Sequence, residues 1–272
     1  MVINIHAGHN PDGKVACGAV GMLLESTEAR RVKDRVCTLL KANACTVYDC
    51  TVEDGISQSD VLQKIVRKCN ANEVELDVSI HFNSGRNDYA GDDSLGGVEI
   101  YTYAATSKAV PAAKSVIEKI AAKGYRNRGT KVADFYVLRK SKAPAMLIEC
   151  CFVDDADDVD LYDADSIAQA IAEGILATNH SAASDSSQPE QEPVSITTPT
   201  SSSAAAKPSP PYYVKIKALT LNIRASSSIN SKIKGVVRNK EIYTIVETKG
   251  HWGRLKSGAG WISISTKYVQ YI

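Results

Sequence analysis

The stretch Val78-Ser79-Ile80-His81-Phe82 decides the fold, together with the stretch Met146-Leu147-Ile148-Glu149. Apolar runs of this length predict strands that are covered on both faces. His81 interrupts the first run, and Glu149 closes the second. A buried carboxylate costs several kcal/mol unless it is paired or bound to a metal, so these polar side chains predict a site as well as a core.

Strand and helix patterns alternate through residues 1–179, which predicts an α/β fold with a mostly parallel sheet and helices on both faces. In such sheets, ligand sites lie beyond the carboxyl ends of strands. The expected strands are Val2–Ile5, Cys45–Tyr48, Leu76–Phe82, Gly97–Tyr103, Tyr136–Leu138 and Ala145–Cys150. The expected helices are Leu24–Ala42, Ser57–Cys69, Val110–Lys123 and Ser166–Ala177.

The composition changes over residues 180–211, which are rich in Ser, Ala, Thr and Pro. Such a segment cannot bury a core and predicts a disordered linker. Short β-rich pieces separated by Gly, Asn and Ser turns follow in residues 212–272 and predict a small SH3-like β-barrel. Within it we expect Trp261 to belong to the core, and Trp252 to be either core or a ligand platform.

The composition of the 272-residue chain excludes several classes of protein. A net charge of +1 does not provide the excess of positive charge that is typical of nucleic-acid or membrane binding. The odd number of cysteines, seven, fits reduced, partly buried thiols better than a disulfide framework, and we expect Cys150 and Cys151 to be buried strand residues. No apolar run approaches transmembrane length, and the N-terminus shows no signal-peptide pattern.

Four polar residues at strand ends or helix starts predict a hydrolytic zinc site. Catalytic zinc takes three protein ligands and keeps one position open for water. We assign His9, Glu25 and His81 as ligands of Zn²⁺ and Glu149 as the general base.

Each ligand assignment has an alternative. His6 competes with His9, but His9 follows a glycine in the loop where side chains turn toward the cleft, so His6 is expected to support a ligand. Glu28 competes with Glu25, which lies nearer the centre of the apolar helix face. Both glutamates could instead favour the positive end of the helix dipole.

The remaining two residues also have structural interpretations. An isolated His81 would be a core histidine, but Asn83 at the same strand end could orient a ligand or a substrate amide. Glu149 could be a structural carboxylate paired with Arg128 or Arg139.

These residues carry a specific resemblance over residues 1–178. The matching segments are Ile5-His6-Ala7-Gly8-His9, Glu25 before a helix, Ser79-Ile80-His81-Phe82-Asn83, Asn127-Arg128-Gly129 and Ala143-Pro144-Ala145-Met146-Leu147-Ile148-Glu149-Cys150-Cys151-Phe152. Together they resemble the zinc-dependent N-acetylmuramoyl-L-alanine amidases of the type 3 family. The resemblance implies zinc ligation by His9, Glu25 and His81 and catalysis by Glu149.

The chain departs from that family at three places. The family usually has Asp where His6 stands, a Gly-Phe pair where Cys150-Cys151-Phe152 stands, and a glycine-rich tail where Asn10-Pro11-Asp12-Gly13 stands. These differences concern fine substrate contacts and not the metal ligands.

The C-terminal segment resembles bacterial SH3-like cell-wall-binding domains through Leu221-Asn222-Ile223-Arg224, Gly235, Trp252, Gly260-Trp261-Ile262 and Tyr268-Val269. A catalytic unit tethered to a wall-binding unit, without a signal peptide, is similar to phage endolysins of Gram-positive hosts. The resemblance implies synthesis in the host cytoplasm, action on the cell wall after release, and peptidoglycan and a cell-wall polymer as partners.

The expected reaction is hydrolysis of the amide bond between N-acetylmuramic acid and L-alanine. Two alternatives stay open at this point. One is a zinc peptidase that cuts the stem peptide or cross-bridge, and the other is a catalytically inactive cell-wall-binding protein. The intact set of His9, Glu25, His81 and Glu149 argues against the inactive protein.

Overall fold

The computed structural model describes residues 1–182, 209–218, 220–227, 231–265 and 268–272. The chain divides into two compact units, Met1–His180 and Ser181–Ile272. Most of the predicted linker falls on residues 183–208, which lie outside the described residues. In the described ranges, no helix combines the length and apolar character needed to cross a bilayer.

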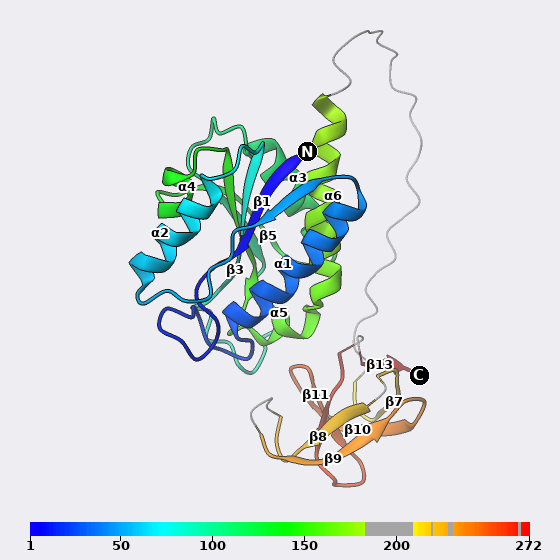
Figure 1. Ribbon diagram of the computed structural model, residues 1–272. Helices are drawn as coiled ribbons and strands as arrows, with labels where there is room; N and C mark the ends of the chain where they lie inside the picture. Colours follow the sequence, from blue (N-terminus) through cyan, green and yellow to red (C-terminus); the bar gives the residue numbers. More distant parts are fainter. Residues whose placement is uncertain (183–208, 219, 228–230, 266–267) are drawn as a thin grey trace, which may run out of the picture. The chain divides into compact units, whose positions relative to one another are not determined.

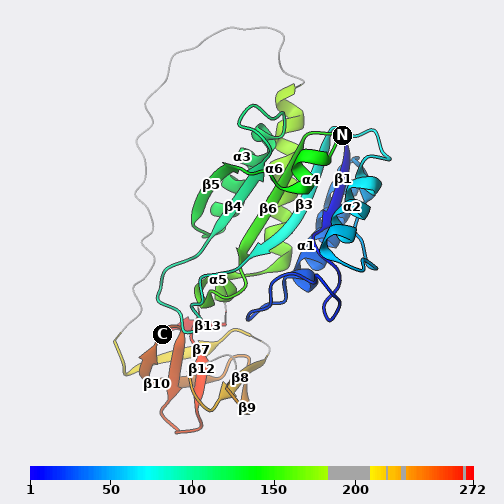
Figure 2. The same ribbon diagram turned by 90° about the vertical axis from the view of Figure 1, so that its left-hand side faces the viewer.

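The first unit is built on a six-stranded sheet with the order β2-β1-β3-β6-β4-β5. Figure 2 shows the labelled strands from β5 to β1 side by side. Only one of the five pairings, between β4 and β6, is antiparallel, which confirms the mostly parallel sheet. The strands are β1 Val2–Ala7, β2 Thr46–Asp49, β3 Leu76–Asn83, β4 Val98–Thr102, β5 Asn127–Val132 and β6 Ala145–Phe152.

Helices cover both faces of this sheet, as predicted (Figure 1). One face carries α1 (Glu25–Ala42), α3 (Val110–Ala121) and α6 (Ala164–Ala182), whose apolar residues form one core with the strands. The other face carries α2 (Gln58–Cys69) and α4 (Tyr136–Lys140) over a smaller core. The short helix α5 spans Ala156–Leu161.

The expected strand at Tyr136–Leu138 is wrong, because this segment begins helix α4. Val137 and Leu138 pack into the core beneath α2, and the edge strand is formed instead by β5. A three-residue apolar run fits a strand or a helix, so its periodicity could not distinguish between the two. Helix α6 is also longer than expected and includes His180, which we had placed in the linker.

Side-chain alternation along the central strands positions the site. Ile80, Ile100 and Ile148 belong to the larger core. Their neighbours His81, Glu99 and Glu149 point to the opposite face, because successive side chains of a strand alternate. The smaller core under α2 and α4 contains Ala145 and Leu147 of β6, whereas Glu149 lies outside it. The polar residues therefore lie where the apolar cover of this face ends.

The C-terminal unit is an antiparallel sheet with the order β13-β7-β10-β11-β12-β8-β9, consistent with the small β domain expected there. Trp252 is buried, whereas Trp261 is only partly buried, so our assignment of Trp261 to the core was wrong. Ile262 fills the core instead, since neighbouring residues point to opposite sides. The β-rich pattern also predicts a strand over Leu219–Ile223, and its first residue lies outside the described residues. The strands are β7 Tyr212–Ile216, β8 Thr220–Arg224, β9 Ile233–Arg238, β10 Ile242–Lys249, β11 Trp252–Leu255, β12 Trp261–Ser263 and β13 Val269–Tyr271.

Candidate active site

His9, Glu25 and His81 come together in the structure although 72 residues separate the first from the last. Each offers one nitrogen or oxygen atom, and these three atoms lie within 4.8 Å of one another. His9 lies in the loop after β1, Glu25 is the first residue of α1, and His81 lies near the end of β3. Three remote segments thus meet at the carboxyl end of the parallel strands.

The Glu25 carboxylate is the centre of this group. Its Oε1 lies 3.3 Å from His9 Nε2 and 3.0 Å from His81 Nδ1. The donors of a tetrahedral zinc site with bonds of about 2.0–2.1 Å stand roughly 3.3 Å apart, so both spacings fit such a site. Burial would raise the pKa of Glu25, but hydrogen bonds and charge from both histidines lower it well below its ordinary value.

Backbone amides fix the orientation of the same carboxylate. Oε1 accepts a hydrogen bond from the Phe82 amide at 3.2 Å, and Oε2 accepts one from the Ala19 amide at 2.7 Å. Glu25 is only 4% exposed, so these contacts hold a desolvated carboxylate in one orientation.

The loop that carries His9 has an unusual backbone. His9 itself has φ 64°, a left-handed conformation that costs a non-glycine residue free energy and that often occurs at functional sites. Gly8 precedes it and donates its amide to the Ile80 carbonyl at 2.9 Å. A Cβ atom at Gly8 would collide with the His81 ring, so this position requires glycine. The requirement did not show in the sequence because it depends on a residue 73 positions away.

The alternative residues lie apart from this group. His6 is buried, and its Nδ1 lies 3.5 Å from Ser79 Oγ. Burial and the charge of His81 lower the pKa of His6 to about 3, so the ring is neutral at ordinary pH. Glu28 accepts a hydrogen bond from the Tyr162 hydroxyl at 2.7 Å. Neither residue belongs to the set of three converging donors.

Glu149 lies beside His81, its registered neighbour across β3 and β6. Within the described residues, its Oε2 is buried and has no hydrogen-bond partner. Burial, with the negative charges of Glu25 and Glu99, raises the pKa of Glu149 well above its ordinary value. Neither arginine considered as its partner pairs with it, since Arg128 and Arg139 bind other carboxylates. A buried carboxyl group with a free oxygen is suited to accept a proton.

Glu99 is a residue of this region that our sequence reasoning missed. It is the registered neighbour of Glu149 across β4 and β6 and is 3% exposed. Its Oε1 accepts hydrogen bonds from Asn83 Nδ2 and the Tyr101 hydroxyl, each at 2.7 Å. The sequence did carry a signal, because Glu99 interrupts the apolar strand Val98–Thr102 as His81 interrupts its own.

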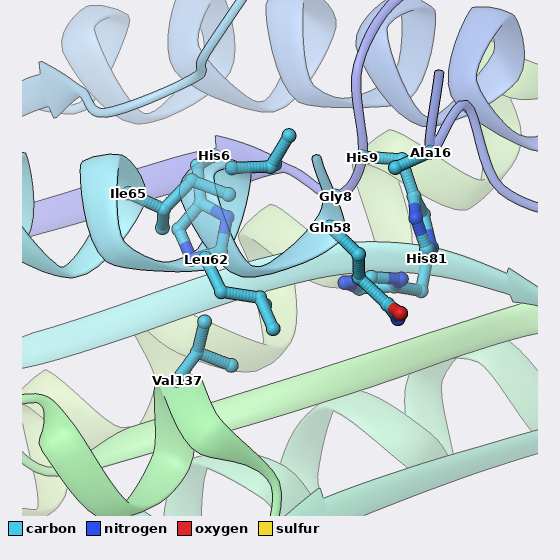
Figure 3. Close-up of a pocket in the computed structure, with 10 residues that line it drawn as sticks. His6, Gly8, His9, Ala16, Gln58, Leu62, Ile65, His81 and Val137 are labelled. Atoms are coloured by element: carbon cyan, nitrogen blue, oxygen red, sulfur yellow. The ribbon is translucent and has the colours of Figure 1, made fainter. Parts of the chain in front are cut away.

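A pocket adjoins the two histidines on the side of α2 and α4 (Figure 3). His9 and His81 stand at one end of it, next to Gln58, and Leu62 and Val137 lie toward the other. The walls are mostly apolar. The full lining is His6, Gly8, His9, Ala16, Gln58, Val61, Leu62, Ile65, His81 and Val137.

The seven cysteines are free, and six of them are buried. Cys150 and Cys151 are fully buried in the larger core, which confirms their assignment as strand residues.

Comparison with known proteins identifies relatives of the first unit. A family model described as N-acetylmuramoyl-L-alanine amidase matches residues 3–178. The endolysin of Bacillus phage SPP1 is 29% identical over 180 residues, which cover 62% of this chain and 61% of that protein. The N-acetylmuramoyl-L-alanine amidase LytC of Bacillus subtilis (strain 168) is 36% identical over 186 residues, which cover 64% of this chain and 35% of that protein.

A solved structure gives the same relationship. The N-acetylmuramoyl-L-alanine amidase AmiC2 of Nostoc punctiforme matches with a TM-score of 0.55 and 29% identity, covering 66% of this chain and 97% of that one. The chain spans about half the length, 51%, of two Clostridium perfringens relatives that it also matches.

Proposed function

Since the chain belongs to the N-acetylmuramoyl-L-alanine amidase family, we propose that it hydrolyses the amide bond between N-acetylmuramic acid and L-alanine in peptidoglycan. The observation that carries this proposal is the placement of Glu149 directly beside the converging His9, Glu25 and His81. Three potential metal ligands lie next to a carboxyl group with one oxygen that has no hydrogen-bond partner among the described residues, and these are the components of metal-assisted hydrolysis.

Zinc is the metal that this donor set fits. His9 Nε2, Glu25 Oε1 and His81 Nδ1 would hold it, since two imidazoles and one carboxylate match the ligand set of catalytic zinc sites. When bound, zinc supplies Lewis acidity, which polarises a carbonyl oxygen and makes water more acidic. The two contacts of Glu25 with backbone amides keep its carboxylate in place for this role.

Glu149 is the proposed general base and acid. A free oxygen of its carboxyl group would take a proton from the attacking water and deliver it to the leaving amine. Burial favours the protonated form, so the group is suited to hold that proton between the two steps. The two histidines are less suited to this role, because His9 Nε2 and His81 Nδ1 face the Glu25 carboxylate and are the proposed ligand atoms.

The biological role that we propose is that of an endolysin. The likeness to the endolysin of Bacillus phage SPP1 supports a wall-degrading enzyme of phage type. In this proposal residues 212–272 form an SH3-like domain that binds a cell-wall polymer, and the segment between the end of α6 at Ala182 and the start of β7 at Tyr212 acts as its tether. Such a tether would raise the local concentration of the catalytic domain, residues 1–179, near the amide bonds that it cuts in the cell wall.

Product analysis tests the reaction. Purified Gram-positive cell walls are digested with the protein, and the new end groups are identified by mass spectrometry and N-terminal labelling. We expect new L-alanine amino groups in equal number to free lactyl carboxylates. New amino groups from any other stem or cross-bridge residue would identify a peptidase instead. A protein that binds walls and releases no end groups would be an inactive wall-binding protein.

A further inference from the structure

A cluster of charged side chains lies beside Glu149, on the side away from the histidines. Glu99 Oε2 accepts a hydrogen bond from Arg128 Nε at 2.6 Å, and Lys131 Nζ donates to the same oxygen. Arg128 and Lys131 both come from the edge strand β5, whereas Glu99 belongs to β4. Two cations therefore share one buried carboxylate, and the formal charge of these three side chains together is +1.

Both cations keep donors for a further partner. Arg128 has five N–H donors, of which, among the described residues, Nε binds Glu99 and Nη1 binds the Gly96 carbonyl at 3.3 Å. Its guanidinium lies 5.0 Å from the centre of the Phe152 ring, which fixes its plane. The Arg128 and Lys131 side chains are 27% and 38% exposed, so the unused donors are reachable from solvent.

The cluster lies within reach of the reacting bond. Arg128 reaches from β5 to Glu99. Glu99 is the registered neighbour of Glu149 on the adjacent strand, one strand spacing of ~5 Å away. One residue of extended chain spans ~3.5 Å, and the α-carboxyl group of the next residue lies one or two bonds farther. When the scissile amide lies at Glu149 and the stem peptide runs from β6 toward β5, a carboxylate on the residue after L-alanine is therefore within reach of the cations.

We propose that Arg128 and Lys131 bind the free α-carboxylate of the stem-peptide residue that follows L-alanine. This inference rests on the function proposed above. In peptidoglycan that residue carries either a carboxylate or its primary amide, and the cluster selects the carboxylate because guanidinium and ammonium groups bind an anion more strongly than an amide. Glu99 acts as a positioning residue, since its buried carboxylate holds both cations toward the site.

The test uses two muropeptides that differ in this one group. They are N-acetylmuramoyl-L-alanyl-γ-D-glutamyl-L-lysine and its isoglutamine counterpart. We measure kcat and KM for both with the full-length protein, and we measure the affinity of the full-length Glu149→Gln variant for both by calorimetry. Charge-assisted hydrogen bonds predict that wild type favours the carboxylate by about 10- to 100-fold in kcat/KM, mainly through KM.

The variants are Lys131→Gln and Arg128→Lys. Lys131→Gln leaves Glu99 paired with Arg128, and Arg128→Lys keeps the charge but removes the planar donor geometry. Each is expected to reduce the preference several-fold or more. The control is Arg139→Gln, a comparably exposed arginine that pairs with Asp134, and it should keep the wild-type preference.

The outcomes separate the two proposals. The carboxylate site would be overturned if the wild-type protein showed equal kcat/KM, and the Glu149→Gln variant equal affinity, for both muropeptides. An unchanged preference in both Lys131→Gln and Arg128→Lys would overturn it too. Failure to cut either muropeptide, combined with tighter binding of the carboxylate form, would overturn the proposed reaction and leave the carboxylate site standing. Circular dichroism melting of each variant separates loss of folding from loss of preference.

Discussion

Glu149 and His81 are registered neighbours on the parallel strands β6 and β3, and both point to the face that α2 and α4 cover only in part. Glu99 extends the same row on β4. A proposed metal ligand, a proposed base and a carboxylate that holds two cations thus occupy consecutive positions across three strands. Because neighbouring strands of a sheet lie about 5 Å apart, the sheet fixes the distance between the backbones of neighbouring residues in this series.

The first prediction concerns the metal. His9→Ala and His81→Ala should each lose zinc and activity together, because each removes one of the three converging donors. Zinc content is measured by atomic emission after gel filtration. Glu28→Gln is the control and should keep its zinc, since Glu28 lies outside the set of donors and accepts a hydrogen bond from Tyr162. Full zinc occupancy in the double variant His9→Ala/His81→Ala would contradict the ligand assignment.

The second prediction concerns Glu149. Glu149→Gln should keep its zinc and its fold but lose about 10²- to 10⁴-fold in turnover, the usual contribution of a general base. Steady-state hydrolysis of purified cell walls gives the measurement. Glu118→Gln, an exposed substitution on α3, serves as control and should act like wild type. Activity within a few-fold of wild type would make Glu149 a structural residue.

The third prediction is a pH dependence of stability. Burial would raise the pKa of Glu99, but hydrogen bonds from Arg128, Lys131 and Tyr101 lower it to about 2. A depressed pKa means that the stabilising contribution is present above pH ~4.5, the unfolded value, and is lost as the pH falls toward 2. Glu99→Gln should therefore lower the free energy of unfolding by about 1–3 kcal/mol at pH 7.

The difference in the free energy of unfolding between wild type and Glu99→Gln should shrink steadily below pH ~4.5. Urea denaturation at a series of pH values measures it. A constant difference from pH 7 to pH 2.5 would show that the loss comes from packing and not from the ionised carboxylate.

The fourth prediction concerns Gly8. A Cβ atom there would collide with the His81 ring, so Gly8→Ala should displace that ring and weaken zinc binding by about 10- to 100-fold. A competition titration with a zinc chelator measures the change. Gly235→Ala is the matched control, because a Cβ atom there meets only Ile223 Cδ1 at an ordinary 3.5 Å. Equal zinc affinity of both variants would show that His81 adjusts at no cost.

The fifth prediction concerns the two units. Residues 1–182 should fold alone, since every member of the core around the six-stranded sheet, in the part of the chain that the structure describes, comes from the first unit. Residues 209–272 have a separate core and should fold and bind walls without cutting them. Thermal melting and sedimentation with purified walls test both fragments. A folded fragment 209–272 that stays in the supernatant would remove the proposed targeting role.

The sequence by itself determined most of the helices and strands of the first unit and the residue types of the site. Apolar runs interrupted by His81 and Glu149 predicted buried strands with polar ends, because periodicity and the cost of burying charge can both be read locally. The same local rule, applied to Glu99, would have found that carboxylate too. It failed at Tyr136–Leu138, where three apolar residues fit a strand and a helix equally well.

Only the tertiary structure decided which candidates meet. His6 and Glu28 have the same chemistry as His9 and Glu25. The left-handed backbone of His9, directly after Gly8, turns its side chain toward Glu25 and His81. Glu25 points toward both histidines from the start of α1. The strand order β3-β6-β4 then sets Glu149 between His81 and Glu99. These are contacts between residues far apart in the chain, and strand order and register, which place them, follow from packing of the whole sheet.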